Sequence, residues 1–200
     1  MYIVIGFCKC GTTSLTTYFS DNGLHTIHHG DYEVRPRGHT WYVGKIIDRN
    51  KKENKKLLSD VPKSIQAFTQ IDYQGRNPII PQLTDVPLFI EQYPNAKFIL
   101  NIRPVDKWIN SINRWQVGGG TLRQSWIKSG LPYLPKSVGE KDEEIREWYN
   151  GHNKRMKELF IDIPERLFVL DLENINIEKL NEFCDLHNVD KFPWKKRKNS

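Results

Sequence analysis

The residues best suited to chemistry lie in the segment Gly6–Thr13, which reads Gly-Phe-Cys-Lys-Cys-Gly-Thr-Thr and follows an apolar N-terminal run. Two glycines let a backbone fold around an anion, and a helix that starts at Thr13 would present its positive end to that anion. The hydroxyls of Thr12, Thr13 and Ser14 add hydrogen-bond donors. The pattern predicts a phosphate-binding loop, and a tight strand-to-helix turn with an incidental lysine is the alternative.

Lys9 stands in the middle of this segment. In ATPases and GTPases the lysine directly follows the second glycine, a position that Thr12 occupies here. A lysine in mid-loop can lie beside the group that leaves a 5′-phosphate, where its charge would stabilise the departing oxygen. The shift argues against an ordinary ATPase or GTPase and predicts a catalytic role for Lys9.

The segment Gly6–Leu15 resembles the 5′-phosphosulfate loop of the P-loop sulfotransferases, which commonly reads Lys-x-Gly-Thr-Thr, as Lys9–Thr13 does. A second match supports this resemblance. The family binds the donor's 3′-phosphate with an Arg at the end of a strand and a Ser eight residues later, and Arg103 and Ser111 have that spacing here. Arg103 ends an apolar run, and Ser111 would lie about one or two turns into the next helix.

The resemblance implies transfer of a sulfuryl group from 3′-phosphoadenosine 5′-phosphosulfate (PAPS) to an acceptor hydroxyl or amine, with no metal. A glycan, a small alcohol, a phenol and a protein tyrosine all remain open as acceptors. The implied donor-binding residues are Lys9, Cys10, Gly11, Thr12, Thr13, Ser14, Arg103 and Ser111.

The general base is marked less clearly. Family members often carry a His or Glu near the end of the strand that precedes the 3′-phosphate strand. Asp72, after the predicted strand Gln66–Ile71, is the better positional match. Asp85 stands in a run similar to one that carries a His in some members, and it also fits a helix cap. We predict Asp72 as the base, with Asp85, His28 and His29 as alternatives.

The elements that must position these residues alternate between strands and helices. Apolar runs predict strands, and periodic apolar residues with end signals predict helices. A strand, a glycine loop, a helix and a strand begin the chain, so we expect an α/β fold with a P-loop-type parallel sheet flanked by helices. The expected strands are Tyr2–Gly6, Leu24–His28, Gln66–Ile71, Lys97–Ile102 and Leu167–Leu170, and the expected helices include Asp48–Ser59, Val86–Tyr93, Asp106–Trp115, Asp142–Phe160 and Ile177–His187.

Several other residues have ordinary structural explanations. Cys8 and Cys10 could be low-pKa thiols at a helix N-terminus, but small-residue filling of the loop is favoured. Trp108 and Trp115 share a helix face and are expected in the core, although one aromatic ring could stack on the donor's base. The run Gly118–Gly120 predicts a hinge or a flexible loop.

Charge and composition limit the classes of function. The net charge is +6, of which residues 191–200 contribute +5 and the rest only +1, so a body-wide nucleic-acid surface is not expected. No apolar run approaches the roughly 18 residues of a membrane span. Three cysteines make no disulfide framework, and the N-terminus lacks the basic region of a secretory signal. We expect one cytoplasmic domain over residues 1–200, with no membrane partner.

Two alternative functions and the role of one segment stay open. A P-loop kinase that uses ATP and Mg²⁺ is the first alternative, and a non-catalytic nucleotide- or nucleic-acid-binding protein is the second. The basic tail 191–200 could close over the donor's 3′-phosphate.

Overall fold

Five parallel strands form the centre of the computed structural model, which describes residues 1–31, 41–75, 77–130 and 139–194. Their order across the sheet is β2-β5-β1-β6-β9, and every neighbouring pair is parallel. The predicted α/β fold with a parallel sheet is therefore confirmed. The strands are β1 (Tyr2–Val4), β2 (Thr26–Ile27), β5 (Ala67–Phe68), β6 (Lys97–Ile102) and β9 (Leu167–Asp171).

Both faces of this sheet are buried, which explains why its strands read as continuous apolar runs. Successive side chains of a strand point to opposite faces. Ile3 and Ile5 accordingly join one hydrophobic cluster with Phe98, whereas Val4 and Ile99 join the other.

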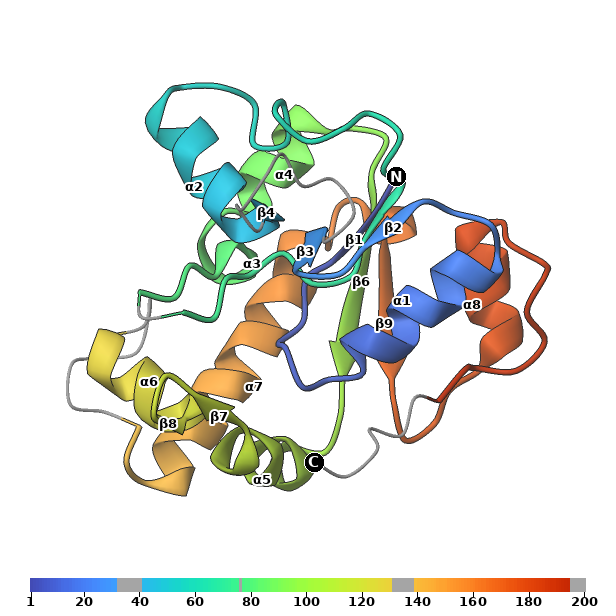
Figure 1. Ribbon diagram of the computed structural model, residues 1–200. Coiled ribbons are helices and arrows are strands. Elements are labelled where there is room, and N and C mark those ends of the chain that lie inside the picture. Colours follow the sequence, from blue (N-terminus) through green and yellow to red (C-terminus); the bar gives the residue numbers. More distant parts are fainter. Residues whose placement is uncertain (32–40, 76, 131–138, 195–200) are drawn as a thin grey trace.

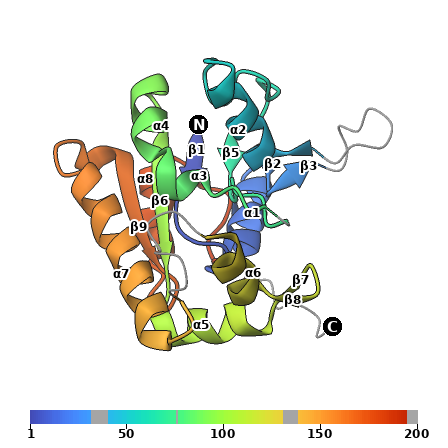
Figure 2. The ribbon, with the colours of Figure 1, turned by 90° about the vertical axis from the view of Figure 1, so that its left-hand side faces the viewer.

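Helices cover the two faces in separate groups. Figure 1 shows α1 and α8 beside each other on one side of the sheet, and α2, α3, α4 and α7 on the other. Figure 2 views the second group from its own side. The helices of the two groups are α1 (Thr12–Asp21), α8 (Ile177–Cys184), α2 (Val43–Lys52), α3 (Pro81–Thr84), α4 (Val86–Gln92) and α7 (Asp142–Leu159).

The remaining helices and a hairpin lie near the carboxyl ends of the strands (Figure 1). Phe7, in the loop after β1, packs against Trp108 and Trp148 with ring centroids 4.9 and 4.7 Å away. Aromatic packing thus fixes this end of the molecule to the loop. The elements here are α5 (Val105–Arg114), β7 (Gln116–Val117), β8 (Gly120–Thr121) and α6 (Leu122–Ser129). Three short elements lie outside these groups: β3 (Gly30–Asp31), β4 (Trp41–Tyr42) and the 3₁₀ turn Pro164–Arg166.

The helix predicted over Asp48–Ser59 was placed wrongly, because it begins at Val43 and ends at Lys52. Its start is set by the buried residues Val43, Ile46 and Ile47, which have helical spacing. Of the charged residues that suggested an exposed helix, Asp48, Arg49, Lys51 and Lys52 lie in its second half, and Glu53, Lys55 and Lys56 lie after its end. Α-helical structure therefore follows the apolar stripe and not the charge.

Other predicted boundaries change for local reasons. Gly118 and Gly119 are neither a hinge nor an open loop: with φ of 61° and 88° they form the two-residue turn of the β7–β8 hairpin. The last helix ends at Cys184, where Asp185 has a left-handed φ of 50°. Asp106 does not cap α5, since Pro104 holds the N-cap position and Asp106 lies in the first turn. Within the described residues, no helix combines the length and apolarity needed to cross a membrane.

Candidate active site

A cavity of about 610 Å³ lies at the carboxyl ends of the parallel strands, where open α/β sheets bind their ligands. We call its two walls the loop side and the histidine side. The loop side comprises Lys9, Gly11, Thr13, Ser14, Arg103, Ser111 and Trp115, the histidine side comprises His28, His29, Tyr42, Gln70, Tyr73, Gln74 and Gly75, and Thr12 lies between them.

The loop after β1 has the backbone of an anion cradle. Lys9 and Gly11 both have left-handed φ angles, of 66° and 74°. Gly11 is the N-cap of α1, and no side chain caps this helix. The first N–H groups of a helix have no partner within it, so the N-terminus of α1 offers donors and a positive dipole end to the cavity.

Three consecutive carbonyls of the loop accept hydrogen bonds from side chains of β6, of α5 and of the link between them. They are Cys8 O, bonded by Trp108 Nε1 at 3.1 Å, Lys9 O, bonded by Arg103 Nη1 at 3.0 Å, and Cys10 O, bonded by Asn101 Nδ2. A Cβ at Gly6 would collide with Asn101, so the loop needs glycine there to approach β6. Asn101 was not singled out in the sequence. A polar residue inside an apolar strand was the available signal.

The loop side carries two positive charges. The Lys9 ammonium lies 4.5 Å from the ring centroid of Trp115. Arg103 keeps a buried Nε–H that has no hydrogen-bond partner among the described residues. Ser111 lines the same cavity, so the structure brings together the predicted phosphate loop, Arg103 and Ser111. Trp115 also faces the cavity, whereas Trp108 is fully buried, as expected for a core residue.

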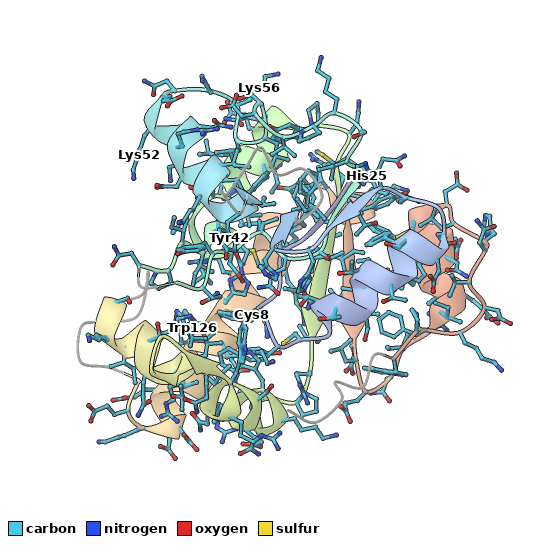
Figure 3. The ribbon with its side chains drawn as sticks, in the orientation of Figure 1. Cys8, His25, Tyr42, Lys52, Lys56 and Trp126 are labelled. Atoms are coloured by element: carbon cyan, nitrogen blue, oxygen red, sulfur yellow. The ribbon has the colours of Figure 1, made fainter. Side chains whose placement is uncertain are left out.

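The histidine side joins the loop through Thr12. His28 Nε2 lies 3.1 Å from Thr12 Oγ1, and His28 Nδ1 lies 2.9 Å from His29 Nδ1. The ring of His29 is nearly parallel to that of Tyr42, at an angle of 20° and a centroid distance of 6.1 Å. Figure 3 shows Tyr42 near the start of α2, above Cys8 of the loop.

Neither predicted carboxylate faces this cavity. Asp72 is fully buried, and its two oxygens accept hydrogen bonds from Gln70 Nε2 at 2.7 Å and Gln82 Nε2 at 2.8 Å. Burial raises the pKa of Asp72, and the glutamine amides oppose that rise. Asp85 occupies the N-cap position of α4, but its side chain pairs with Lys51 instead of capping. The arrangement therefore gives no support to the expectation that Asp72 or Asp85 is the base.

The cysteines serve as packing. Cys8 and Cys10 are buried, and burial raises the pKa of the Cys10 thiol to about 12. Cys10, one of the expected donor-binding residues, does not line the cavity with its side chain. Residues 195–200, which carry most of the basic tail, lie outside the described residues, so its expected closure over the 3′-phosphate does too.

Comparison with protein families assigns the chain to one family. The family model described as "Sulfotransferase domain" matches residues 2–200. The chain belongs to the sulfotransferase domain family. A search of curated proteins gives no match.

Family membership makes the chain a transferase of the sulfotransfer type. The cavity fits that chemistry because its loop side has cationic groups and a helix N-terminus. Histidine, tyrosine and glutamine side chains line the rest of the cavity. Among the described residues there is no group of three or more His, Cys, Asp or Glu arranged to hold a metal ion.

Proposed function

We propose that this chain transfers the sulfuryl group of PAPS to a hydroxyl or amine of an acceptor, within one domain. The observation that carries this proposal is that Lys9, Arg103 and Ser111 share one cavity, although Ser111 is about a hundred residues from the loop. The uncapped N-terminus of α1 would hold the 5′-phosphosulfate, and Arg103 with Ser111 would hold the 3′-phosphate.

Arg103 is suited to the 3′-phosphate because a buried guanidinium N–H without a partner gains most from an anion. Its other contact, to Lys9 O, ties the 3′-phosphate site to the loop. A nucleotide that occupies both sites would therefore be held at two points, which fixes the sulfur relative to the rest of the cavity.

In the reaction, the acceptor oxygen or nitrogen attacks sulfur while the bond from sulfur to the 5′-phosphate oxygen breaks. The electron pair of that bond stays on adenosine 3′,5′-bisphosphate, and Lys9 stabilises the growing negative charge. The acceptor's proton passes to a base. Side chains of the histidine side are the candidates for this base. Asp72 and Asp85 are buried and do not line the cavity.

A thermal-shift panel of adenosine 3′,5′-bisphosphate, AMP, and ATP with Mg²⁺ tests the donor. A ligand at a hundred times its Kd stabilises the folded protein by about 2.7 kcal/mol. We expect the bisphosphate to raise Tm more than AMP does, because only the bisphosphate has the 3′-phosphate. Stabilisation by ATP with Mg²⁺ and none by the bisphosphate would favour the kinase alternative and overturn the proposal.

A further inference from the structure

Asn101 is a polar side chain inside β6, and it is fully buried and does not line the cavity. Side chains alternate along a strand, so Asn101 shares a face with Ile99, which belongs to the hydrophobic cluster that also contains Cys10 of the loop. Pairing of β1 with β6 through Val4 and Ile99 brings Gly6 beside Asn101 two residues further on. The side chain therefore approaches the loop from inside the protein.

The amide of Asn101 can be turned in only one way. Its Nδ2 donates to the carbonyl oxygen of Cys10, and a carbonyl oxygen can only accept, so the nitrogen must lie on that side. This turns Oδ1 toward Gly6, where a Cβ would lie 2.2 Å from it. Oδ1 is buried and has no hydrogen-bond partner among the described residues. Because an unpaired buried oxygen costs free energy, the bond to Cys10 O is the contribution that distinguishes Asn101 from an apolar residue of similar shape.

The bond to Cys10 O sets the direction of the next N–H group. The peptide bond between Cys10 and Gly11 is trans, so its C=O and its N–H point in opposite directions. The C=O points to the buried Asn101, and the N–H of Gly11 therefore points the other way, toward the cavity that Gly11 lines. Within the part of the chain that the structure describes, this N–H has no hydrogen-bond partner.

This N–H does not stand alone. Gly11 is the N-cap of α1 and has a left-handed φ of 74°, so its N–H lies next to the first N–H groups of the helix. Successive N–H groups that point into one concavity bind anions. The direction of the Gly11 N–H thus decides whether the loop and the helix N-terminus act on the same anion.

We propose that Asn101 is a positioning residue for the donor's 5′-phosphosulfate, and that it acts by aiming the Gly11 N–H at that group. The inference rests on the proposed function. Asn101 itself does not touch the donor, since it is fully buried outside the cavity lining. Its effect is confined to the 5′ end of the nucleotide, because Arg103 and Ser111 hold the 3′-phosphate.

Three nucleotides separate this role from general support of the fold. Adenosine 3′,5′-bisphosphate and AMP carry a 5′-phosphate, whereas adenosine 3′-monophosphate does not. Asn101→Leu keeps the approximate size of the side chain and removes the donor. In calorimetry, the Kd of the first two should rise about 10- to 100-fold, as for loss of a hydrogen bond to a charged group, and that of the third should stay near wild type. Unchanged affinity for all three, or an equal loss for all three, would overturn the proposal.

Asn50→Leu is the matched control for the removal of a buried asparagine. Asn50 is also fully buried, donates through Nδ2 to a backbone carbonyl, that of Leu57 at 3.1 Å, and has an Oδ1 without a partner among the described residues. It lies in α2 and does not line the cavity. The variant should lose stability to urea much as Asn101→Leu does and keep all three Kd values. A similar loss of nucleotide affinity in both variants would show that destabilisation is the cause, and it would overturn the positioning role.

The peptide unit can also be observed in the wild-type chain, so the proposal stays testable if Asn101→Leu does not fold. Cys10–Gly11 is the only Cys-Gly pair in the sequence, so ¹³C-carbonyl cysteine with ¹⁵N-glycine gives one doubly labelled peptide. Its amide proton should move downfield when AMP or the bisphosphate binds, and stay in place with adenosine 3′-monophosphate. A Gly11 amide that does not respond when AMP binds would overturn the proposal. Failure of the wild type to bind the bisphosphate at all would instead overturn the proposed function.

Discussion

The two sides of the cavity are held together by different means. The loop side is held through its backbone: Asn101 of β6, Trp108 of α5 and Arg103 between these elements donate to three successive carbonyls of the loop. The histidine side is joined by hydrogen bonds between side chains, which run from His28 through Thr12 and Gln70 to the buried carboxylate of Asp72. The first arrangement fixes positive charge in place, whereas the second links side chains that follow β2 and β5 to the start of α1. Changes to the loop side should alter binding or charge stabilisation, and changes to the histidine side should alter proton transfer.

Lys9→Met should give the largest effect on the loop side. Methionine keeps the length of the side chain but removes the charge that would stabilise the departing oxygen. Loss of one such group costs about 10²–10³-fold in rate. Release of bisphosphate from PAPS should fall by this factor, while calorimetry should find the affinity for the bisphosphate nearly unchanged.

Lys107→Met is the matched control for Lys9, because Lys107 pairs with Glu173 at the surface. It should keep the full rate. If Lys9→Met lost affinity as strongly as rate, Lys9 would be a binding residue, and the separation of roles within the loop side would be lost.

Arg103→Ala should have the next largest effect, on binding. A hydrogen bond to a charged group contributes about 1.5–3 kcal/mol, so the Kd of adenosine 3′,5′-bisphosphate should rise about 10- to 100-fold. The Kd of AMP should rise less, because AMP lacks the 3′-phosphate and reports only the lost support of Lys9 O. Arg114→Ala, at the far end of α5 and bonded to Asn110 O, should change neither Kd. An equal rise for both nucleotides would contradict the assignment of Arg103 to the 3′-phosphate.

The sequence predicts the loop side better than the histidine side. Lys9 and Arg103 each follow a strand, Ser111 lies in the helix after Arg103, and parallel strands bring their carboxyl ends to one edge, so these residues could be predicted to meet. The fold itself was predictable because strands buried on both faces leave apolar runs.

The histidine side depends on which strands are neighbours. β5 lies between β1 and β2, and this brings both Gln70 and His28 within hydrogen-bond distance of Thr12. Sequence order alone does not give that arrangement. It also does not show that Asp72 is enclosed by glutamine amides, which is why a carboxylate after a strand was taken for a base. The start of α2 was missed because its apolar stripe is short and its charged residues are many.

His152 provides a smaller test, because it is a histidine that bonds the backbone between β1 and the loop without lining the cavity. Its Nε2 bonds Ile5 O at 2.9 Å, and burial lowers its pKa to about 4. Between about pH 6.5 and 4 the unfolded chain binds a proton that the folded protein does not, so stability falls as pH falls, by about 1.4 kcal/mol per pH unit. Urea unfolding across this range should give a wild-type slope that includes this contribution, and His152→Gln should reduce it. His187→Gln, at an exposed site, should keep it.

Trp115→Phe should have the smallest effect, and it tests how the loop side holds its mobile charge. Lys9 lies over the indole ring, and a cation above an exposed aromatic ring gains about 0.5–1 kcal/mol. Phenylalanine keeps a weaker ring, so the rate of bisphosphate release should fall by less than the two- to fivefold that this energy allows. Trp115→Leu, which removes the ring, should approach about fivefold. The backbone of the loop is held by β6 and α5, so the Kd of the bisphosphate should stay near its wild-type value in both variants. A large rise in that Kd would mean that Trp115 contacts the nucleotide itself, and the loop side would then bind its ligand partly through stacking and not through charge alone.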